Sequence, residues 1–340
     1  MVLQLAADAT ARGDNVAVAS AGGSWAPKLE EAGGRFFPMP LARRRPWVAV
    51  VAAQALSRAV RATRPDVVHT HNVGVTLTTR LALATGRHRP PVVTTLHGLA
   101  PADYRNAARV LRVASDRVVC CAPSVSRRLL ACGFPPARSE TVLNGAHLDP
   151  ADADRRRRVA RDLGLDQIGG ALVVGVGRLV EQKSWDTLIE ASLHLEDVEF
   201  AVAGDGPLRA EHSRRAAQAG GRVHFVGLVD DVAAFLGLGT AGVSVSSWEG
   251  LPLSLLEMLS LGLPTVATAV DGVTDIVPDQ AAVLVPPGEP RTVADAIRSI
   301  VSDADRAAAL SRAARDAAPA WSPEAMLGAY RKVYERAVSR

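Results

Sequence analysis

The sequence S-S-W-E-G-L-P-L-S-L-L-E-M-L-S-L-G-L-P, which runs from Ser246 to Pro264, predicts a loop, a helix and a marked end of that helix. Pro252 suits the first helical position, and the closing G-L-P ends the helix. Glu249 then precedes the helix and Glu257 lies about one and a half turns into it. Both carboxylates can therefore face the N-terminal end of the helix.

The start of this helix favours an anion, because its first N–H groups have no partner within the helix and the helix dipole is positive there. Those N–H groups belong to Gly250, Leu251, Leu253 and Ser254. Two carboxylates beside an anion would weaken its binding by repulsion unless they have ligands of their own. Sugar hydroxyls on each side of a diphosphate would be such ligands, since a carboxylate accepts paired hydrogen bonds. The stretch thus predicts a nucleotide-sugar site; the alternative is a buried amphipathic helix with two incidental surface glutamates.

The two glutamates within E-G-L-P-L-S-L-L-E resemble the signature of the retaining glycosyltransferases of family 4, which have the GT-B fold. The resemblance implies an α/β protein of two Rossmann-like domains that face each other across a cleft. It also implies that Glu249 and the amides after it hold the donor's sugar, that the helix start holds the diphosphate, and that Glu257 binds the ribose hydroxyls.

A second motif, G-V-G-R-L-V-E-Q-K, follows a predicted buried strand and contains Gly177, Arg178 and Lys183. It fails GxGxxG because Val180 replaces the third glycine, and it fails the ATP-binding GxxxxGK[ST] loop because Gln182 replaces the second. What remains is two cations that can neutralise a diphosphate from two directions. The family's G-R-L-x-x-x-K matches the stretch, which implies that Gly177, Arg178 and Lys183 bind the donor and that the two cations stabilise the departing diphosphate.

Histidines close two predicted strands in the first half. His69 and His71 lie on one strand face, which would suit a metal pair, but no third ligand at a fitting spacing accompanies them. We therefore predict no metal and no cofactor. His97 ends the strand V-V-T-T-L, where parallel sheets bind ligands. The family carries a histidine there, so the resemblance implies that His97 is catalytic, together with Glu249.

Length predicts two domains, since 340 residues can form two cores. We expect an N-terminal acceptor-side domain at 1–147, a linker at 148–169, a nucleotide-sugar domain at 170–318, and a C-terminal helix at 319–340 that crosses back to the first domain. The chain opens with a predicted helix and then a strand, whereas the family begins with a strand and a glycine-rich loop. We therefore expect the first strand of the N-terminal domain upstream of Met1.

Composition restricts the partners. The net charge of +4 comes almost wholly from arginine, and aromatic residues, at 4 %, are too few for a nucleic-acid stacking surface. The basicity is evidence for acidic ligands or peripheral membrane contact. The run Arg43–Arg45 could meet a phosphate or an anionic acceptor, or could be a solvated face.

Cys120, Cys121 and Cys132 form no CxxC pair, and no apolar run reaches the ~20 residues of a membrane span. We expect a cytoplasmic protein, of bacterial origin because arginine enrichment is typical of GC-rich genomes.

The predicted function is retaining transfer of a hexosyl or N-acetylhexosaminyl group from a nucleoside-diphosphate sugar to a hydroxyl. The expected donor is a UDP-sugar, although the loop Leu228–Asp231, where the resemblance places the base, does not settle uridine against guanosine. The acceptor can be a small molecule, a lipid or a glycan. Two alternatives stay open: a GT-B epimerase acting on the nucleotide sugar itself, and a truncated, non-catalytic nucleotide-sugar binder.

Overall fold

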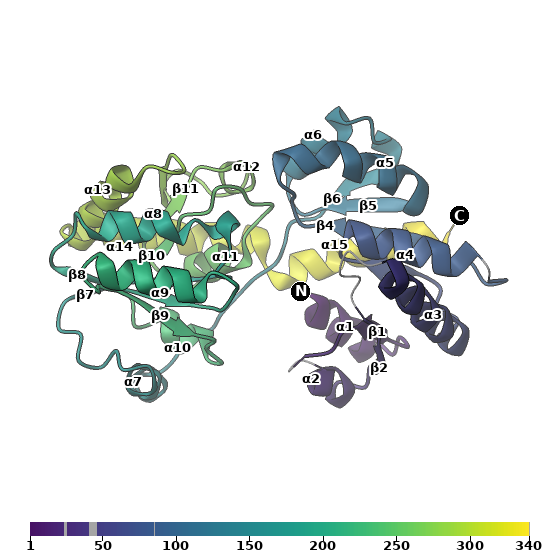
Figure 1. Ribbon diagram of the computed structural model, residues 1–340, viewed down its shortest axis with the longest axis horizontal. Helices are drawn as coiled ribbons and strands as arrows, with labels where there is room; N and C mark the ends of the chain where they lie inside the picture. Colours follow the sequence, from purple (N-terminus) through teal and green to yellow (C-terminus); the bar gives the residue numbers. More distant parts are fainter. Residues whose placement is uncertain (24–25, 41–45, 85, 340) are drawn as a thin grey trace. The chain divides into compact units, whose positions relative to one another are not determined.

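The computed structural model describes residues 1–23, 26–40, 46–84 and 86–339, so the run Arg43–Arg45 lies outside the described residues. The chain divides into two compact units (Figure 1). The first consists of Met1–Gly145 with Pro323–Arg340, and the second consists of Ala146–Ser322.

The strands of the first unit form two parallel sheets. One pairs β1 (Ala17–Ser20) with β2 (Arg35–Pro38). The other has the order β3-β4-β5-β6, with bounds Val68–Thr70, Val92–Leu96, Arg117–Cys120 and Ser139–Thr141. The expectation of a further strand upstream of Met1 stays a prediction.

Helices cover both faces of β4, which explains why all of its residues are buried. Val92 packs with α3 and α4 on one face, and its neighbour Val93 packs with α15 on the other, as the period of two of a strand requires. The helix α15 follows the second unit along the chain but belongs to the first (Figure 1). The helices of this unit are α1 (Val2–Ala11), α2 (Ala26–Glu31), α3 (Pro46–Thr63), α4 (Val73–Ala84), α5 (Tyr104–Ala114), α6 (Pro123–Ala131) and α15 (Pro323–Val338).

The second unit contains a six-stranded parallel sheet in the order β12-β11-β10-β7-β8-β9. Its strands are β7 (Ala171–Val176), β8 (Val198–Ala203), β9 (Val223–Gly227), β10 (Ala241–Ser244), β11 (Thr265–Thr268) and β12 (Val283–Val285). Its helices are α7 (Ala153–Asp162), α8 (Trp185–Ser192), α9 (Arg209–Gln218), α10 (Val232–Leu236), α11 (Leu253–Ser260), α12 (Asp271–Thr274), α13 (Pro290–Val301) and α14 (Ala304–Ala317).

The central strands β7, β8 and β10 are largely apolar and largely buried, because helices cover both of their faces. The core joins Val173, Phe200 and Val243 of the sheet to Trp185 and Ile297 of the helices. Residues 148–169, expected to be a linker, contain α7, and Val159 of α7 packs with Ala233 and Ala234 of α10.

Among the described residues, no helix combines the length and the apolar character needed to cross a membrane.

Candidate active site

The strand order of the second unit reverses between β7 and β10, because β8 and β9 extend the sheet from β7 whereas β11 and β12 extend it from β10. In open α/β sheets, ligands bind beyond the carboxyl ends of the two strands at such a reversal. Gly177 and Arg178 come directly after β7, and Glu249 lies in the loop between β10 and α11. The topology therefore brings the two predicted donor-binding motifs to one end of the sheet.

Lys183 and Glu249 form an ion pair at this end of the sheet. The Nζ of Lys183 lies 2.6 Å from Oε1 of Glu249, and the two side chains are only 13 % and 8 % exposed. The hydroxyl of Ser246 donates to the same Oε1 at 2.7 Å, and Nε2 of Gln182 lies 3.4 Å from Oε2. The carboxylate thus has the several donors that a buried charge requires.

The loop after β7 and the loop after β10 are joined by further hydrogen bonds. The Nε2 of Gln182 donates to the carbonyl oxygen of Trp248 at 3.0 Å, and the hydroxyls of Ser184 and Ser247 are hydrogen-bonded to each other. The backbone N–H of Ser247 donates to the carbonyl of Gln182 at 2.9 Å. The two motifs are therefore held together without any ligand.

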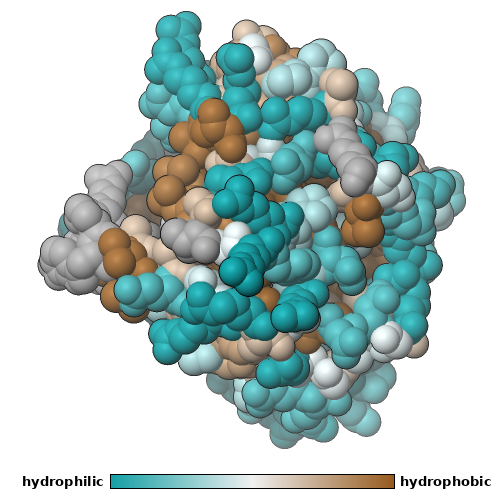
Figure 2. All heavy atoms as spheres, turned by 90° about the vertical axis from the view of Figure 1, so that its right-hand side faces the viewer, coloured by the Kyte–Doolittle hydropathy of each residue, from teal (hydrophilic) through white to brown (hydrophobic). Residues whose placement is uncertain are grey.

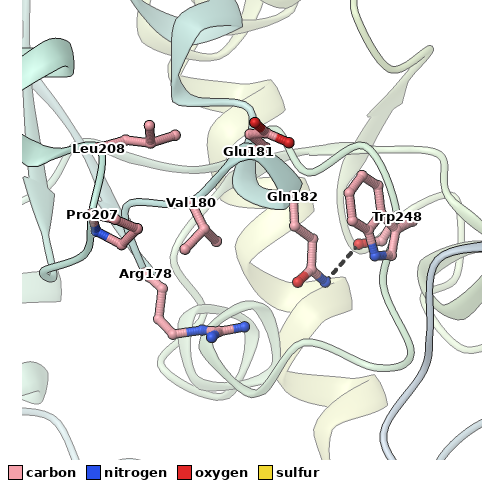
Figure 3. A pocket seen from close by; sticks show the side chains of 7 residues that line it. All are labelled: Arg178, Val180, Glu181, Gln182, Pro207, Leu208 and Trp248. Carbon is pink, nitrogen blue, oxygen red and sulfur yellow. Dashed lines mark hydrogen bonds between the residues drawn. The ribbon is translucent and has the colours of Figure 1, made fainter. Parts of the chain in front are cut away.

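Arg178 differs from Lys183 in having no bonded partner for its side chain among the described residues, and it is exposed. It lines a hollow of about 390 Å³ in the second unit. Figure 3 shows its guanidinium group and the side-chain amide of Gln182 pointing into the same space, with the ring of Trp248 beyond. The other lining residues are Val180, Glu181, Pro207 and Leu208. A planar guanidinium with free donors beside such a hollow suits an anionic, phosphate-bearing ligand.

Gly177 allows the loop after β7 to lie close to the ring of Trp185. A Cβ atom added to Gly177 would lie 3.1 Å from that ring, and the indole Nε1 donates to the carbonyl oxygen of Arg178 at 3.1 Å. Trp185 is almost fully buried. The packing of Trp185 beneath the loop after β7 thus positions Arg178, whose side chain lines the hollow.

The helix α11 begins at Leu253, one residue after the predicted start, and Pro252 occupies its N-cap without a side-chain hydrogen bond. Leu255 and Leu256 donate their N–H groups to the carbonyl of Pro252, which leaves the N–H groups of Leu253 and Ser254 in the unpaired first turn. Gly250 and Leu251 are buried, whereas Leu253 and Ser254 are half-buried. The helix end therefore has the geometry of an anion site.

Gly272, at the start of α12, lies against the carbonyl of Gly250. A Cβ atom added to Gly272 would overlap the oxygen of Gly250, and the carbonyl of Glu249 is also close. Gly272 was not among the residues predicted from the sequence. The absence of a side chain at this position supports the loop that carries Glu249.

Glu257 lies in the second turn of α11 and is half-buried. Burial raises the pKa of its carboxyl group, since a low-polarity setting disfavours the charged form. Among the described side chains, none bonds to this carboxylate. Glu257 is therefore available to hydroxyl groups of a ligand.

In the first unit, His97 follows β4 and pairs with His71, which follows β3. The Nδ1 of His71 lies 3.2 Å from Nε2 of His97, and the two rings are stacked with their planes 15° apart. One ring must donate and the other accept. Burial and the neighbouring His97 lower the pKa of His71 to about 3. Near pH 7 both rings are therefore neutral, and one of them donates its N–H to the other in the shared hydrogen bond.

Hydroxyl groups occupy both ring nitrogens of His69. Nδ1 lies 2.8 Å from the hydroxyl of Tyr334, and Nε2 lies 2.7 Å from that of Thr95. The hydroxyl of Tyr330 also lies 2.8 Å from that of Thr95. Within the described part of the chain, no group of three or more histidine, cysteine, aspartate or glutamate side chains is arranged to hold a metal ion.

The predicted residues fall into two groups. Gly177, Arg178, Lys183, Glu249 and Glu257, with the residues at the start of α11, belong to the second unit, whereas His97 belongs to the first. Several residues of the site were not predicted from the sequence, among them Gln182 and Ser246, which contact Glu249, and Trp248, which lines the hollow. Gln182 and Trp248 are sequence neighbours of Lys183 and Glu249, but adjacency alone does not say which way a side chain points.

Two family descriptions match the chain. "Glycosyltransferase Family 4" matches residues 1–150, and "Glycosyl transferases group 1" matches residues 170–303. The sulfoquinovosyl transferase SQD2 of Arabidopsis thaliana is 25 % identical over 306 residues, which are 84 % of this chain and 59 % of that protein. The 2-deoxystreptamine glucosyltransferase of Streptomyces kanamyceticus is 28 % identical over 253 residues, which are 66 % of this chain and 65 % of that protein. The chain thus spans less than two thirds of the length of either relative.

Among solved structures, Anabaena Alr3699/HepE in complex with UDP-glucose is similar, with a TM-score of 0.84. The sequences are 18 % identical, and the match covers 98 % of this chain and 95 % of that one. At this identity, the likeness establishes the fold.

Proposed function

The chain belongs to the family 4 glycosyltransferases and has the GT-B fold, and from this premise we propose that it transfers a hexosyl or N-acetylhexosaminyl group from a UDP-sugar to a hydroxyl acceptor with retention of configuration. The observation that carries the proposal is Arg178, which is exposed, has no bonded side-chain partner among the described residues, and lies beside a hollow at the strand-order reversal. The loop after β10, which carries Glu249, and the start of α11 lie at the same end of the sheet. Arg178 and the start of α11 support a phosphate-binding side of the site, and Glu249 supports a sugar-binding side.

In the proposed reaction, the bond between the anomeric carbon and the phosphate oxygen breaks, and its electron pair leaves with the nucleoside diphosphate. The acceptor oxygen bonds to the anomeric carbon on the same face, and its proton ends on the departing phosphate oxygen. Arg178, Lys183 and the N-terminus of α11 stabilise the charge that develops on the diphosphate. No carboxylate has to act as a covalent nucleophile.

Glu249 holds the donor's sugar in this proposal, and Lys183 restrains the carboxylate while sharing its charge with the diphosphate. The short contact between Lys183 and Glu249 supports this shared role, because both groups are already desolvated and oriented before the donor binds. Glu257 accepts hydrogen bonds from the ribose hydroxyls, and His97 acts in the transfer step.

The experiment that tests the proposal is binding of UDP, GDP and their sugars by the purified protein, followed by transfer assays with lipid, glycan and small hydroxyl acceptors. Arg178→Ala should cost about 2 to 4 kcal/mol of transition-state stabilisation, by analogy with the loss of one oxyanion donor. Arg312→Ala, at an exposed position on α14, is the matched control and should leave turnover unchanged. His97→Ala should lower turnover more than nucleotide affinity.

Three outcomes would contradict the proposal. Conversion of the nucleotide sugar without an acceptor would identify an epimerase. Binding without transfer to any acceptor would identify a nucleotide-sugar binder. Affinity for UDP that is the same in the wild type and in Glu257→Ala would show that the ribose is held elsewhere.

A further inference from the structure

Positive charge is concentrated in one segment of the first half of the chain. Residues 32–102 contain ten arginines and a single acidic residue, Asp66, so the net charge of this segment exceeds the +4 of the whole chain. The helices α3 and α4 lie within it and contain no acidic residue. The remainder of the chain therefore has an excess of carboxylates, and the charge is segregated rather than uniform.

The same two helices expose large apolar side chains. Val50 and Val51 on α3 are 57 % and 45 % exposed, and Leu77 and Leu81 on α4 are 40 % and 58 % exposed. Single exposed apolar residues are normal on a protein surface. Here, two adjacent residues of one helix and an i, i+4 pair of the next are exposed together, which calls for an explanation.

These side chains lie on the outer side of one layer. On their opposite sides, α3 and α4 pack against the sheet in one buried cluster. This cluster contains Leu56 of α3, Leu83 of α4 and Val92 of β4. Since both helices bury one side against the same sheet face, their exposed sides point to solvent in the same layer. Figure 2, which looks at the molecule from the right of Figure 1, shows hydrophobic patches among strongly hydrophilic side chains on the face that it presents.

Arginines surround the carboxyl ends of the two helices. The ring of His88, beyond α4, bonds to the carbonyl of Pro65, beyond α3, at 2.8 Å, which brings the two ends together. Arg58 and Arg61 are exposed on α3, and Arg87 is exposed beyond α4. Among the described residues, none of these three forms an ion pair. By contrast, Arg80 is already paired with Asp116 at 2.8 Å.

We propose that the outer face of α3 and α4, made of Val50, Val51, Arg58, Arg61, Leu77 and Leu81, docks the protein on an anionic lipid surface. Arginines attract the acidic headgroups, and the aliphatic side chains enter the headgroup region. A nucleic acid is the less suitable partner, because the exposed apolar groups that define the face are aliphatic and offer no stacking. None of these residues belongs to the donor site, so the inference does not depend on the proposed enzymatic function.

The test is co-sedimentation of the full chain with vesicles of phosphatidylcholine alone and of phosphatidylcholine mixed with phosphatidylglycerol. Binding should require phosphatidylglycerol and should weaken at high salt, because surface charges are then screened. The double variant Arg58→Gln with Arg61→Gln should lower the partition coefficient about 25-fold, since each arginine near an anionic surface contributes a factor of about five. Leu77→Ser with Leu81→Ser should lower it about tenfold or more through loss of apolar burial.

The matched control is Arg291→Gln with Arg312→Gln, which removes the same charge from exposed positions on α13 and α14. It should bind vesicles like the wild type. Equal binding by the face and control variants would overturn the proposal, as would equal binding to both kinds of vesicle. Binding to a duplex oligonucleotide, but not to vesicles, with the same dependence on Arg58 and Arg61 would assign the face to nucleic acid instead. Nucleotide binding by each variant, measured in parallel, reports separately on the donor site and on folding.

Discussion

Lys183 and Glu249 depend on each other because both side chains are largely withdrawn from water. A buried charge that loses its partner costs more than the pair contributes, since its desolvation is no longer offset. Lys183→Met should therefore lower the free energy of unfolding by about 3 kcal/mol. Adding Glu249→Gln should restore most of that loss while transfer stays impaired. Urea denaturation of the single and double variants measures this, and equal instability of the two would show that the ion pair is not the cause.

Glu257 should make the affinity for the donor depend on pH, in a pH range above the one in which glutamate usually titrates. Burial raises the pKa of this carboxyl, and its protonated form accepts fewer hydrogen bonds from ribose. Affinity for UDP should fall as the pH is lowered through the raised pKa, whereas Glu257→Gln should bind more weakly with a flat profile. Calorimetric titration across mildly acidic pH measures both, and a parallel fall in the two proteins would contradict the ribose role.

The raised pKa of Glu257 also determines how its contribution to folding stability changes with pH. The folded protein binds this proton more tightly than the unfolded chain, so the contribution of Glu257 to stability is present at acid pH and is lost as the pH rises through the raised pKa. The difference in stability between Glu257→Gln and the wild type should therefore shift in favour of the variant when the pH is raised from acid to neutral. Urea denaturation at the two pH values checks this sign.

Among the elements, the loop after β10 is supported by the start of α12. Gly272→Ala would place a methyl group on the carbonyl of Gly250, so the loop that carries Glu249 must shift. We expect a loss of roughly 1 to 3 kcal/mol in unfolding free energy, together with weaker nucleotide binding. Gly169→Ala is the control, because the space around Gly169 is open and the added methyl group meets no atom. Unchanged nucleotide affinity in Gly272→Ala would show that the loop is not constrained from this side.

At the scale of the whole molecule, α15 completes the first unit although it follows the second unit along the chain. Tyr330 is 1 % exposed, packs with Val93 and Val119, and places its hydroxyl 2.8 Å from that of Thr95. Tyr330→Ala should cost about 3 kcal/mol or more in the first unit, by analogy with other truncated buried aromatic residues. The second unit should still bind nucleotide, because the residues proposed to bind the donor lie outside this cluster.

Limited proteolysis with identification of the fragments, combined with nucleotide binding, measures both effects of Tyr330→Ala. Cleavage should appear first within residues 1–145. Tyr330→Phe, which keeps the ring, should lose only about 1 kcal/mol. A variant that loses nucleotide binding together with the first unit would show that the two units do not fold separately.

Local chemistry in the sequence determined the α/β class, the helix that begins after Pro252, and Arg178, Lys183 and Glu249 as candidates. Buried strands, helix ends and spaced charges follow from short-range patterns, so they can be predicted residue by residue. The family resemblance extended those patterns to the GT-B fold.

Only the tertiary structure decided which of these residues touch. Lys183 and Glu249 are far apart along the chain, and their contact depends on β7 and β10 lying side by side. The places of Gln182, Ser246 and Gly272 likewise depend on which way loops turn beyond the strands. Such contacts are set by packing between distant segments, which no local pattern contains.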